Sequence, residues 1–162
     1  MKRLTLAGGI PEELRGSILA LGNFDGFHLG HQAVVGRAIA RGFHERRPVI
    51  VATFDPHPVR FFKPDVPPFR LMTLDQRQAL FARDGADAML VLEFGAELAS
   101  MDAEEFVSQV LAKRVGATDC AFPTCHVNRR RALRERAVPA FTTPRSASSV
   151  SSMGVVSSQR WI

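Results

Sequence analysis

The chain lacks the features that would place it in a membrane or among disulfide-rich secreted proteins. No segment approaches the roughly 18 consecutive apolar residues of a membrane-spanning helix. The apolar run near the N-terminus soon meets Pro11, Glu12 and Glu13, so it is too short for a signal sequence. The two cysteines, Cys120 and Cys125, do not have the spacing of a disulfide framework. We therefore expect a cytoplasmic protein with no membrane partner.

Acidic residues are scarce only in the last part of the chain. Residues 1–116 contain 14 Lys/Arg and 14 Asp/Glu, whereas residues 117–162 contain 7 and 2, so the net charge of +5 belongs to the C-terminal segment. We expect a core over residues 1–116 and a basic, Ser- and Arg-rich tail over 117–162 that completes, or fails to complete, the same domain. No nucleic-acid-binding motif accompanies the basic residues, so we expect no nucleic-acid partner.

Three short apolar runs alternate with segments of helical periodicity. The runs predict buried parallel strands, and the order β-α-β-loop-α-β-α predicts an α/β domain with a Rossmann-like parallel sheet. The predicted strands are 17–21, 48–54 and 88–92, and the predicted helices are 29–43, 74–83 and 103–114. Residues 2–16 are expected to be a lead-in with one helical turn, 59–70 a loop and 118–125 an irregular segment.

A glycine-containing segment, Gly22–Gln32, lies between the first predicted strand and the first predicted helix. Its two histidines, His28 and His31, are one helical turn apart and share the face beside the free N–H groups of the helix start. Such a pair can bind phosphate oxygens and stabilise charge during phosphoryl transfer. Alternatively, the pair caps the helix and faces solvent. We expect no protein-bound metal, because no third ligand has a recognisable spacing.

A second polar segment, Asp55-Pro56-His57, follows the next predicted strand. Ligands in parallel α/β sheets bind outside the carboxyl ends of the strands, where both segments fall. The alternative for Asp55 is turn chemistry, since Asp before Pro often builds a turn. The prolines at positions 56 and 58 are expected to exclude a helix there. Phe61 and Phe62 follow in an aromatic, Pro-rich stretch that either contacts a ligand or packs on its own domain.

The two segments resemble the signatures of a known enzyme family. Gly22–Gln32 and Thr53–Pro58 are similar to those of the bacterial FAD synthetase module, which is the FMN adenylyltransferase part of bifunctional riboflavin kinase/FAD synthetase. Leu71–Leu74 and Ser100–Val107 resemble further family segments in the right order. The likeness runs from about Ser17 to Gly116, some 100 of the 162 residues.

The resemblance implies a nucleotidyltransferase fold of the H-x-G-H type and adenylyl transfer from ATP to FMN, giving FAD and pyrophosphate with Mg²⁺. His28 and His31 would stabilise the transition state. Positions implied in ATP and phosphate binding are Gly22, Asn23, Phe24, Asp25, Gly26, Gly30, Ser157, Ser158 and Arg160. Positions implied in the flavin and nucleotide cleft are Asp55, Pro56, His57, Phe61 and Phe62. Three alternatives stay open: another adenylyl- or cytidylyltransferase, a non-catalytic nucleotide-binding partial domain, and a basic-tailed module that touches nucleic acid.

The resemblance weakens after Gly116. The family's glycine-led, Phe-rich segment does not align with residues 119–129, although Ser157-Ser158-Gln159-Arg160 resembles a phosphate-binding helix start near the end of the module. We also expect no riboflavin kinase domain. We hypothesise that residues 117 to about 153 arise from a shifted reading frame or a divergent gene. Translating the source DNA in the other two frames tests this.

Overall fold

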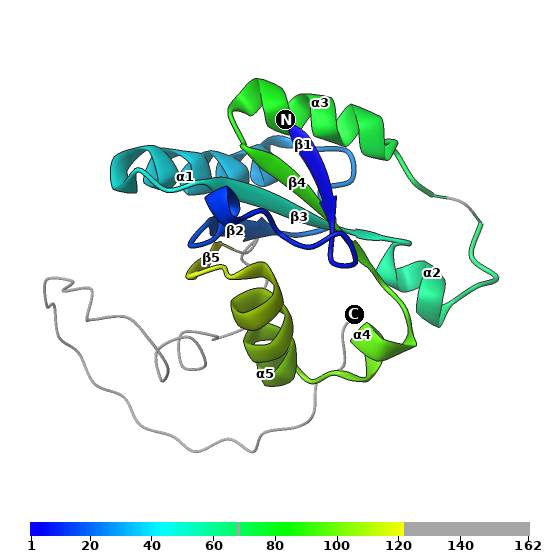
Figure 1. Ribbon diagram of the computed structural model, residues 1–162. Helices are drawn as coiled ribbons and strands as arrows, with labels where there is room; N and C mark the ends of the chain where they lie inside the picture. The colour runs from blue at the N-terminus through cyan, green and yellow to red at the C-terminus, as the bar shows by residue number, and fades with distance from the viewer. Residues whose placement is uncertain (68, 122–162) are drawn as a thin grey trace, which may run out of the picture.

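The computed structural model describes residues 1–67 and 69–121. Its centre is a parallel sheet of five strands in the order β1-β4-β3-β2-β5 (Figure 1). The strands are β1 (Lys2–Thr5), β2 (Ile18–Leu21), β3 (Val49–Asp55), β4 (Ala88–Glu93) and β5 (Asp119–Ala121). The prediction of an α/β fold with a Rossmann-like parallel sheet is confirmed.

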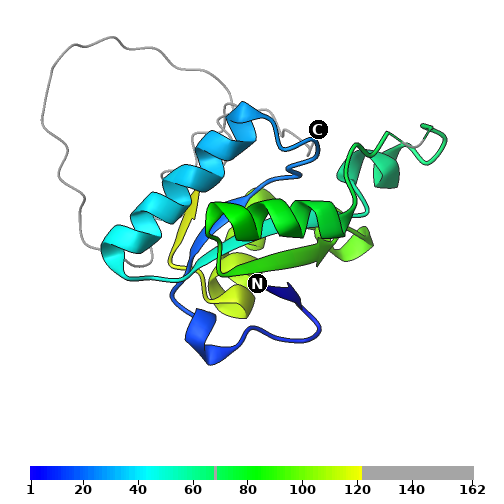
Figure 2. The same ribbon diagram turned by 90° about the horizontal axis from the view of Figure 1, so that it is seen from above.

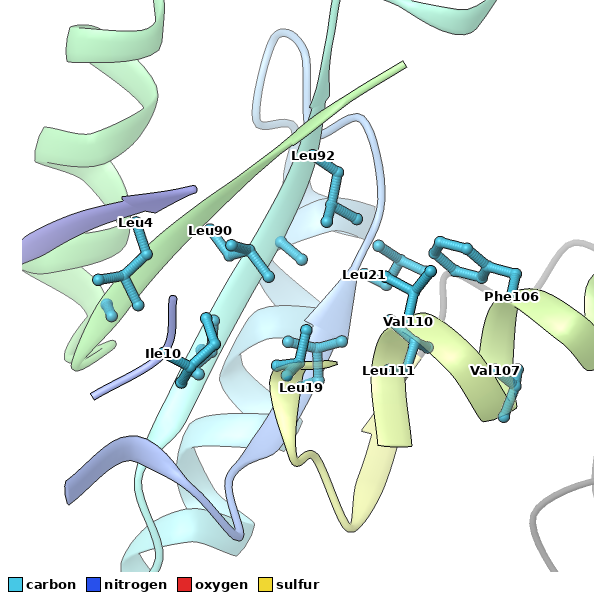
Figure 3. Close-up of a cluster of buried hydrophobic side chains, with 14 of the residues drawn as sticks. Leu4, Ile10, Leu19, Leu21, Leu90, Leu92, Phe106, Val107, Val110 and Leu111 are labelled. Carbon is cyan, nitrogen blue, oxygen red and sulfur yellow. The ribbon is translucent and has the colours of Figure 1, made fainter. Parts of the chain in front are cut away.

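Helices cover both faces of the sheet, which is why its inner strands are apolar along their length. Helices α1 (Leu29–Glu45) and α3 (Leu74–Asp84) lie on one face, and α5 (Ala103–Glu105) with η2, a π-helical segment (Phe106–Val115), lies on the other (Figures 1 and 2). Figure 3 shows how η2 packs against the second face: Leu19 and Leu21 of β2 meet Phe106, Val110 and Leu111.

The ends of the helices follow from capping chemistry. Thr73 and Gln76 form the expected capping box at the start of α3. Gly85 and Gly116 end α3 and η2 with left-handed backbones, at φ 104° and 72°. The predicted stop of α1 at residues 41–43 is wrong, because α1 continues to Glu45. Gly42 is buried inside the helix, where a Cβ atom would lie 2.3 Å from Val49 Cγ2.

Two strands, β1 and β5, were not expected from the sequence. Strand pairing uses backbone groups, so it can occur in segments without an apolar side-chain pattern. The lead-in contains β1, which pairs with β4 from Lys2 to Thr5. Residues Asp119–Ala121, expected to be irregular, form β5 on the free edge of β2. A strand needs only backbone N–H and C=O groups at the right spacing, so these short, mixed segments can complete a sheet whose inner strands are strongly apolar.

The expectation that the prolines exclude a helix is wrong at Pro58, which begins a short helix, α2 (Pro58–Phe62), that extends into the expected loop 59–70. Proline is compatible with the first position of a helix, because the N–H that it lacks would have no partner inside the helix. Two other short helices are η1 (Glu12–Leu14), the expected helical turn of the lead-in, and α4 (Ala96–Ser100). Within the described ranges, no helix is both long and apolar enough to cross a bilayer.

Candidate functional site

The two polar segments lie at the same edge of the sheet. Residues 22–28 leave the carboxyl end of β2, and Asp55 ends the neighbouring strand β3. The N–H of Gly22 still donates to Ala52 O on β3 at 3.1 Å, so the two segments separate only after this point. The expectation that both segments meet outside the carboxyl ends of the strands is confirmed.

His28 and His31 stand at the start of α1. His28 is the N-cap, and its Nδ1 accepts a hydrogen bond from the backbone N–H of His31 at 3.4 Å. Acceptance at Nδ1 places the proton of a neutral His28 on Nε2. The two rings are stacked, with centroids 3.7 Å apart and planes 22° apart. His28 is exposed, so Nε2 is available to a ligand while Nδ1 caps the helix. Capping and ligand binding are therefore compatible roles.

His31 lies partly inside the domain. The ring of Phe24, which is fully buried, meets it edge to face at 5.4 Å. Burial lowers the pKa of His31, His28 acts in the same direction, and the carboxylate of Asp25 opposes both. Among the described residues, its buried Nδ1 has no hydrogen-bond partner. His31 is therefore neutral in a larger pH range than an exposed histidine, and an anion close to it would favour its charged form.

The turn before α1 holds the chain segment that follows α2. The Asp25 carboxylate accepts hydrogen bonds from the N–H groups of Leu71, at 3.0 and 3.1 Å, and Met72, at 2.9 Å. Gly26 has a left-handed backbone, with φ of 75°, and a Cβ atom there would lie 2.9 Å from Leu71 Cδ1. Asp25 and Gly26 thus let residues 71–72 approach the turn closely.

Asp55 and His57 also hold local structure. The Asp55 carboxylate forms an ion pair with Arg70. Nδ1 of His57 accepts from the N–H of Val59 at 3.1 Å and caps α2, while its ring meets Phe69 edge to face at 5.0 Å. Burial lowers the pKa of His57, and Asp25 opposes it. Pro56, between them, is exposed. These residues thus fix the geometry of the wall on the β3 side.

A small pocket opens between the two segments and α3. Its lining residues are Asp25, Phe54, His57, Arg60, Phe69, Arg70 and Arg77. Three arginines and one aspartate give it a cationic character, which suits an anionic ligand. Among the described residues, His28 and His31 are not part of this lining. Asp25 lines the pocket and belongs to the turn that leads to His28, so the histidine pair and the pocket lie next to each other at the carboxyl edge of the sheet.

Phe61 and Phe62 of α2 pack on their own domain. They meet each other edge to face at 5.3 Å, and their centroids lie 5.6 and 5.8 Å from that of Phe94, a buried residue that follows β4. Both remain more than a third exposed, at 39% and 45%. The expectation that these residues pack on their own domain is therefore confirmed. Contact of their exposed parts with a flavin stays a prediction.

Sequence reasoning missed two buried polar residues behind the turn, Thr53 and Arg77. Both are almost fully buried, and both bond to the carbonyl oxygen of Asn23. One signal could have found Arg77. It is three residues after Leu74 and four before Phe81, so it lies on the inward face of the predicted helix. A buried arginine is rare without polar partners, so that position predicts a polar contact with the sheet edge.

Metal ligands do not gather in this region. In the part of the chain that the structure describes, no three His, Cys, Asp or Glu side chains are close enough to hold a metal ion. The carboxylate of Asp25 is bonded to amides and that of Asp55 to Arg70. The implied phosphate-binding residues Ser157, Ser158 and Arg160 lie outside the described residues.

Comparison with known sequences finds one family and several related proteins. The family described as FAD synthetase matches residues 10–122. The chain is 39% identical over 104 residues to a bifunctional riboflavin kinase/FMN adenylyltransferase of Pseudomonas fluorescens, covering 64% of this chain and 33% of that one. Proteins of the same name from Escherichia coli K12 and Bacillus subtilis 168 are each 35% identical over 65% and 63% of this chain, and 33% of theirs. The chain thus spans about a third of the length of these relatives.

Comparison of folds finds solved structures with the same architecture. The crystal structure of a macrolide-efflux protein from Streptococcus pneumoniae superposes with a TM-score of 0.67, at 24% identity, over 75% of this chain and 48% of that one. At this identity the likeness concerns the fold alone. It agrees with the parallel sheet and its helices on both faces.

Proposed function

Since the chain belongs to the FAD synthetase family, we propose that it transfers the adenylyl group of ATP to FMN, giving FAD and pyrophosphate. A phosphate oxygen of FMN attacks the α-phosphorus of ATP. The bond from that phosphorus to the oxygen bridging to the β-phosphorus breaks, and pyrophosphate leaves. The reaction needs no covalent nucleophile from the protein, so its acceleration comes from positioning and electrostatics.

One observation carries the proposal: two stacked imidazoles lie at the start of α1. The turn that leads to them contains Asp25, which also lines the cationic pocket. The N–H groups of the helix start favour phosphate at this place. We assign His28 Nε2 and the ring of His31 to the phosphate oxygens of ATP. There they donate hydrogen bonds as negative charge builds up in the transition state. Gly22, Asn23, Phe24, Gly26 and Gly30 shape the turn that holds these rings.

The cationic pocket supports an anionic second substrate. Arg60 and Arg70 lie in its lining beside His57 and the ring of Phe69. Arginine binds phosphate through several donors at once, and an aromatic ring can stack on a flavin. We therefore assign this pocket, with Asp55, Pro56, His57, Phe61 and Phe62 around it, to FMN.

Mg²⁺ is proposed to arrive with ATP. Magnesium commonly binds through substrate phosphates and one or two carboxylates while keeping several waters. The described carboxylates near the turn, Asp25 and Asp55, already have protein partners and do not form a preformed cage. When bound, the ion would neutralise charge on the phosphates. The chain's own contribution is the imidazole pair and the N–H groups of α1.

The test uses the full chain with ATP, Mg²⁺ and FMN, and measures FAD and pyrophosphate by chromatography. We expect both products in equal amounts. Nucleotide binding without FAD would favour the non-catalytic partial domain. Pyrophosphate release with another phosphate compound, but not with FMN, would favour a different transferase. The matched negative control is the double variant His28→Ala/His31→Ala.

A further inference from the structure

Arg77 is a buried cation that forms no salt bridge with the carboxylates of the described residues. It lies in α3 and is 3% exposed. Across the described ranges, no ion pair joins it to an Asp or Glu side chain, and its Nε has no hydrogen-bond partner. An unpartnered buried donor costs roughly 1–3 kcal/mol. Burying this guanidinium is therefore costly, and the hydrogen bonds that its other nitrogens form should show what the burial achieves.

Those contacts form a closed triangle. Arg77 Nη1 donates to the carbonyl oxygen of Asn23 at 2.9 Å and to Thr53 Oγ1 at 2.7 Å. Thr53 Oγ1 in turn donates to the same Asn23 oxygen at 2.8 Å. The triangle joins α3, the strand β3 and the turn after β2 at one backbone atom. Two donors on one carbonyl fix the orientation of the peptide group between Asn23 and Phe24.

That peptide group leads directly to the histidine pair. Phe24 has a left-handed backbone, with φ of 50°, which a residue with a side chain adopts only when its surroundings hold it. Its fully buried ring contacts His31 at 5.4 Å and Phe81 of α3 at 5.7 Å, edge to face in both cases. A rotation of the peptide group would move Phe24, and with it the packing beneath His31.

We propose that Arg77 is a positioning residue for the phosphate-binding turn: through the Asn23 carbonyl and Thr53, it holds Phe24 and thereby the ring of His31. The inference rests on the proposed function and deepens it, because it identifies a residue of α3 that keeps the imidazole pair in position. Since reacting groups must be held in a near-attack geometry, a shift of about 1 Å can cost about 100-fold in rate.

The rival role for Arg77 is direct contact with a substrate phosphate, because it also lines the cationic pocket. Its 3% exposure and the use of Nη1 in two internal hydrogen bonds favour positioning. Burial lowers the pKa of Arg77, Arg70 acts in the same direction, and Asp25 and Asp55 oppose both. Arginine nevertheless stays protonated in proteins, so the hydrogen bonds persist across the assay range.

Kinetics of the full chain separate the two roles. We expect Arg77→Met and Thr53→Val each to lower kcat for FAD formation about 10- to 100-fold, with KM for ATP and FMN changed less than about threefold. Arg77→Lys should recover part of kcat, because an ammonium group can donate to the same carbonyl. The double variant Arg77→Met/Thr53→Val should be no slower than the slower single variant, since both act on one atom.

Arg83→Met is the matched control, because Arg83 is exposed on the same helix and forms an ion pair with the adjacent Asp84. It should keep the kcat of the unaltered chain. A raised KM with unchanged kcat in Arg77→Met would overturn positioning in favour of substrate binding. Full activity in Arg77→Met would overturn both roles. If Arg77→Met fails to fold, as judged by circular dichroism, Arg77→Lys and Thr53→Val carry the test.

A second readout does not need activity, so it distinguishes failure of this inference from failure of the proposed function. In two-dimensional NMR of the histidine rings, Thr53→Val and Arg77→Lys should shift the His31 signal and leave that of exposed His44 in place. Arg83→Met should move neither signal. If the unaltered chain makes no FAD, the proposed function fails, and the NMR result alone decides whether Arg77 and Thr53 position His31. An unmoved His31 signal in both variants would show that the triangle does not position the ring.

Discussion

The imidazole rings of His28 and His31 are stacked with their centroids 3.7 Å apart, while Nδ1 of His28 accepts the backbone N–H of His31. The hydrogen bond fixes which nitrogen of His28 faces outward. The stacking couples the charges of the two rings, because two imidazolium ions this close repel each other. A polyphosphate beside them would relieve that repulsion. This pair is therefore the place where removal of a side chain should affect catalysis most.

Replacing either histidine by alanine should lower kcat for FAD formation by about 100- to 1,000-fold, the usual effect of losing one donor to a developing negative charge. The double variant should have no measurable turnover. His44→Ala is the matched control, since His44 is exposed near the end of the same helix. Full activity in the double variant would remove the imidazole pair from the mechanism.

The stability of the chain should depend on pH through His31 and His57. Burial lowers the pKa of both in the folded state, whereas histidine in an unfolded chain titrates near about 6.5. As the pH falls below about 6.5, the unfolded chain takes up protons before the folded one, so the free energy of unfolding decreases. Urea unfolding between pH 7 and 5 measures this decrease. It should be shallower in His31→Gln, and equal slopes would contradict the assignment.

Loss of the Asp25 carboxylate should release residues 71–72. It removes the acceptor for the N–H groups of Leu71 and Met72. Because Leu71 follows Arg70, trypsin cleavage after Arg70 reports this release directly. We expect Asp25→Ala to speed that cleavage about tenfold, which corresponds to a loss of about 1.4 kcal/mol. Cleavage after Arg83, inside α3, is the internal control. An unchanged ratio of the two rates would show that Asp25 does not hold the segment.

Much of the fold was predictable because the buried parts carry strong periodicity. Strands β2, β3 and β4 are covered by helices on both faces, so their sequences are continuous apolar runs that indicate buried strands. The edge strands β1 and β5 carry polar residues, since within residues 1–67 and 69–121 each pairs with a strand on one side only. Their pairing depends on backbone groups alone, which a single sequence does not reveal.

The site divides in a similar way. The position of His28 and His31 at the start of a helix was predictable, because the spacing of the two residues after the first apolar run is visible in the sequence. The support behind them was not, because it joins Asn23, Thr53 and Arg77 from three elements. Such a contact depends on how α3 docks on the sheet. The same holds for Asp25, whose partners lie 46 and 47 residues further along the chain.

The last prediction separates stability from catalysis within α1. A Cβ atom at Gly30 would lie 3.1 Å from Cε1 and 3.2 Å from Nδ1 of His28, so the exposed ring must give by a few tenths of an ångström, which disturbs its stacking on His31. Alanine is also a better helix former than glycine, by up to about 1 kcal/mol. We therefore expect Gly30→Ala to fold at least as stably as the unaltered chain but to lose about tenfold in kcat.

Gly36→Ala is the control for this experiment. Gly36 is an exposed position of the same helix, and a Cβ atom there meets nothing within 4 Å. It should gain helix stability without any change in kcat. Thermal unfolding and FAD formation, measured on both variants, give the comparison. Equal activity of the two would mean that the ring of His28 can move without loss, and the role of its Nε2 as a phosphate donor would have to be abandoned.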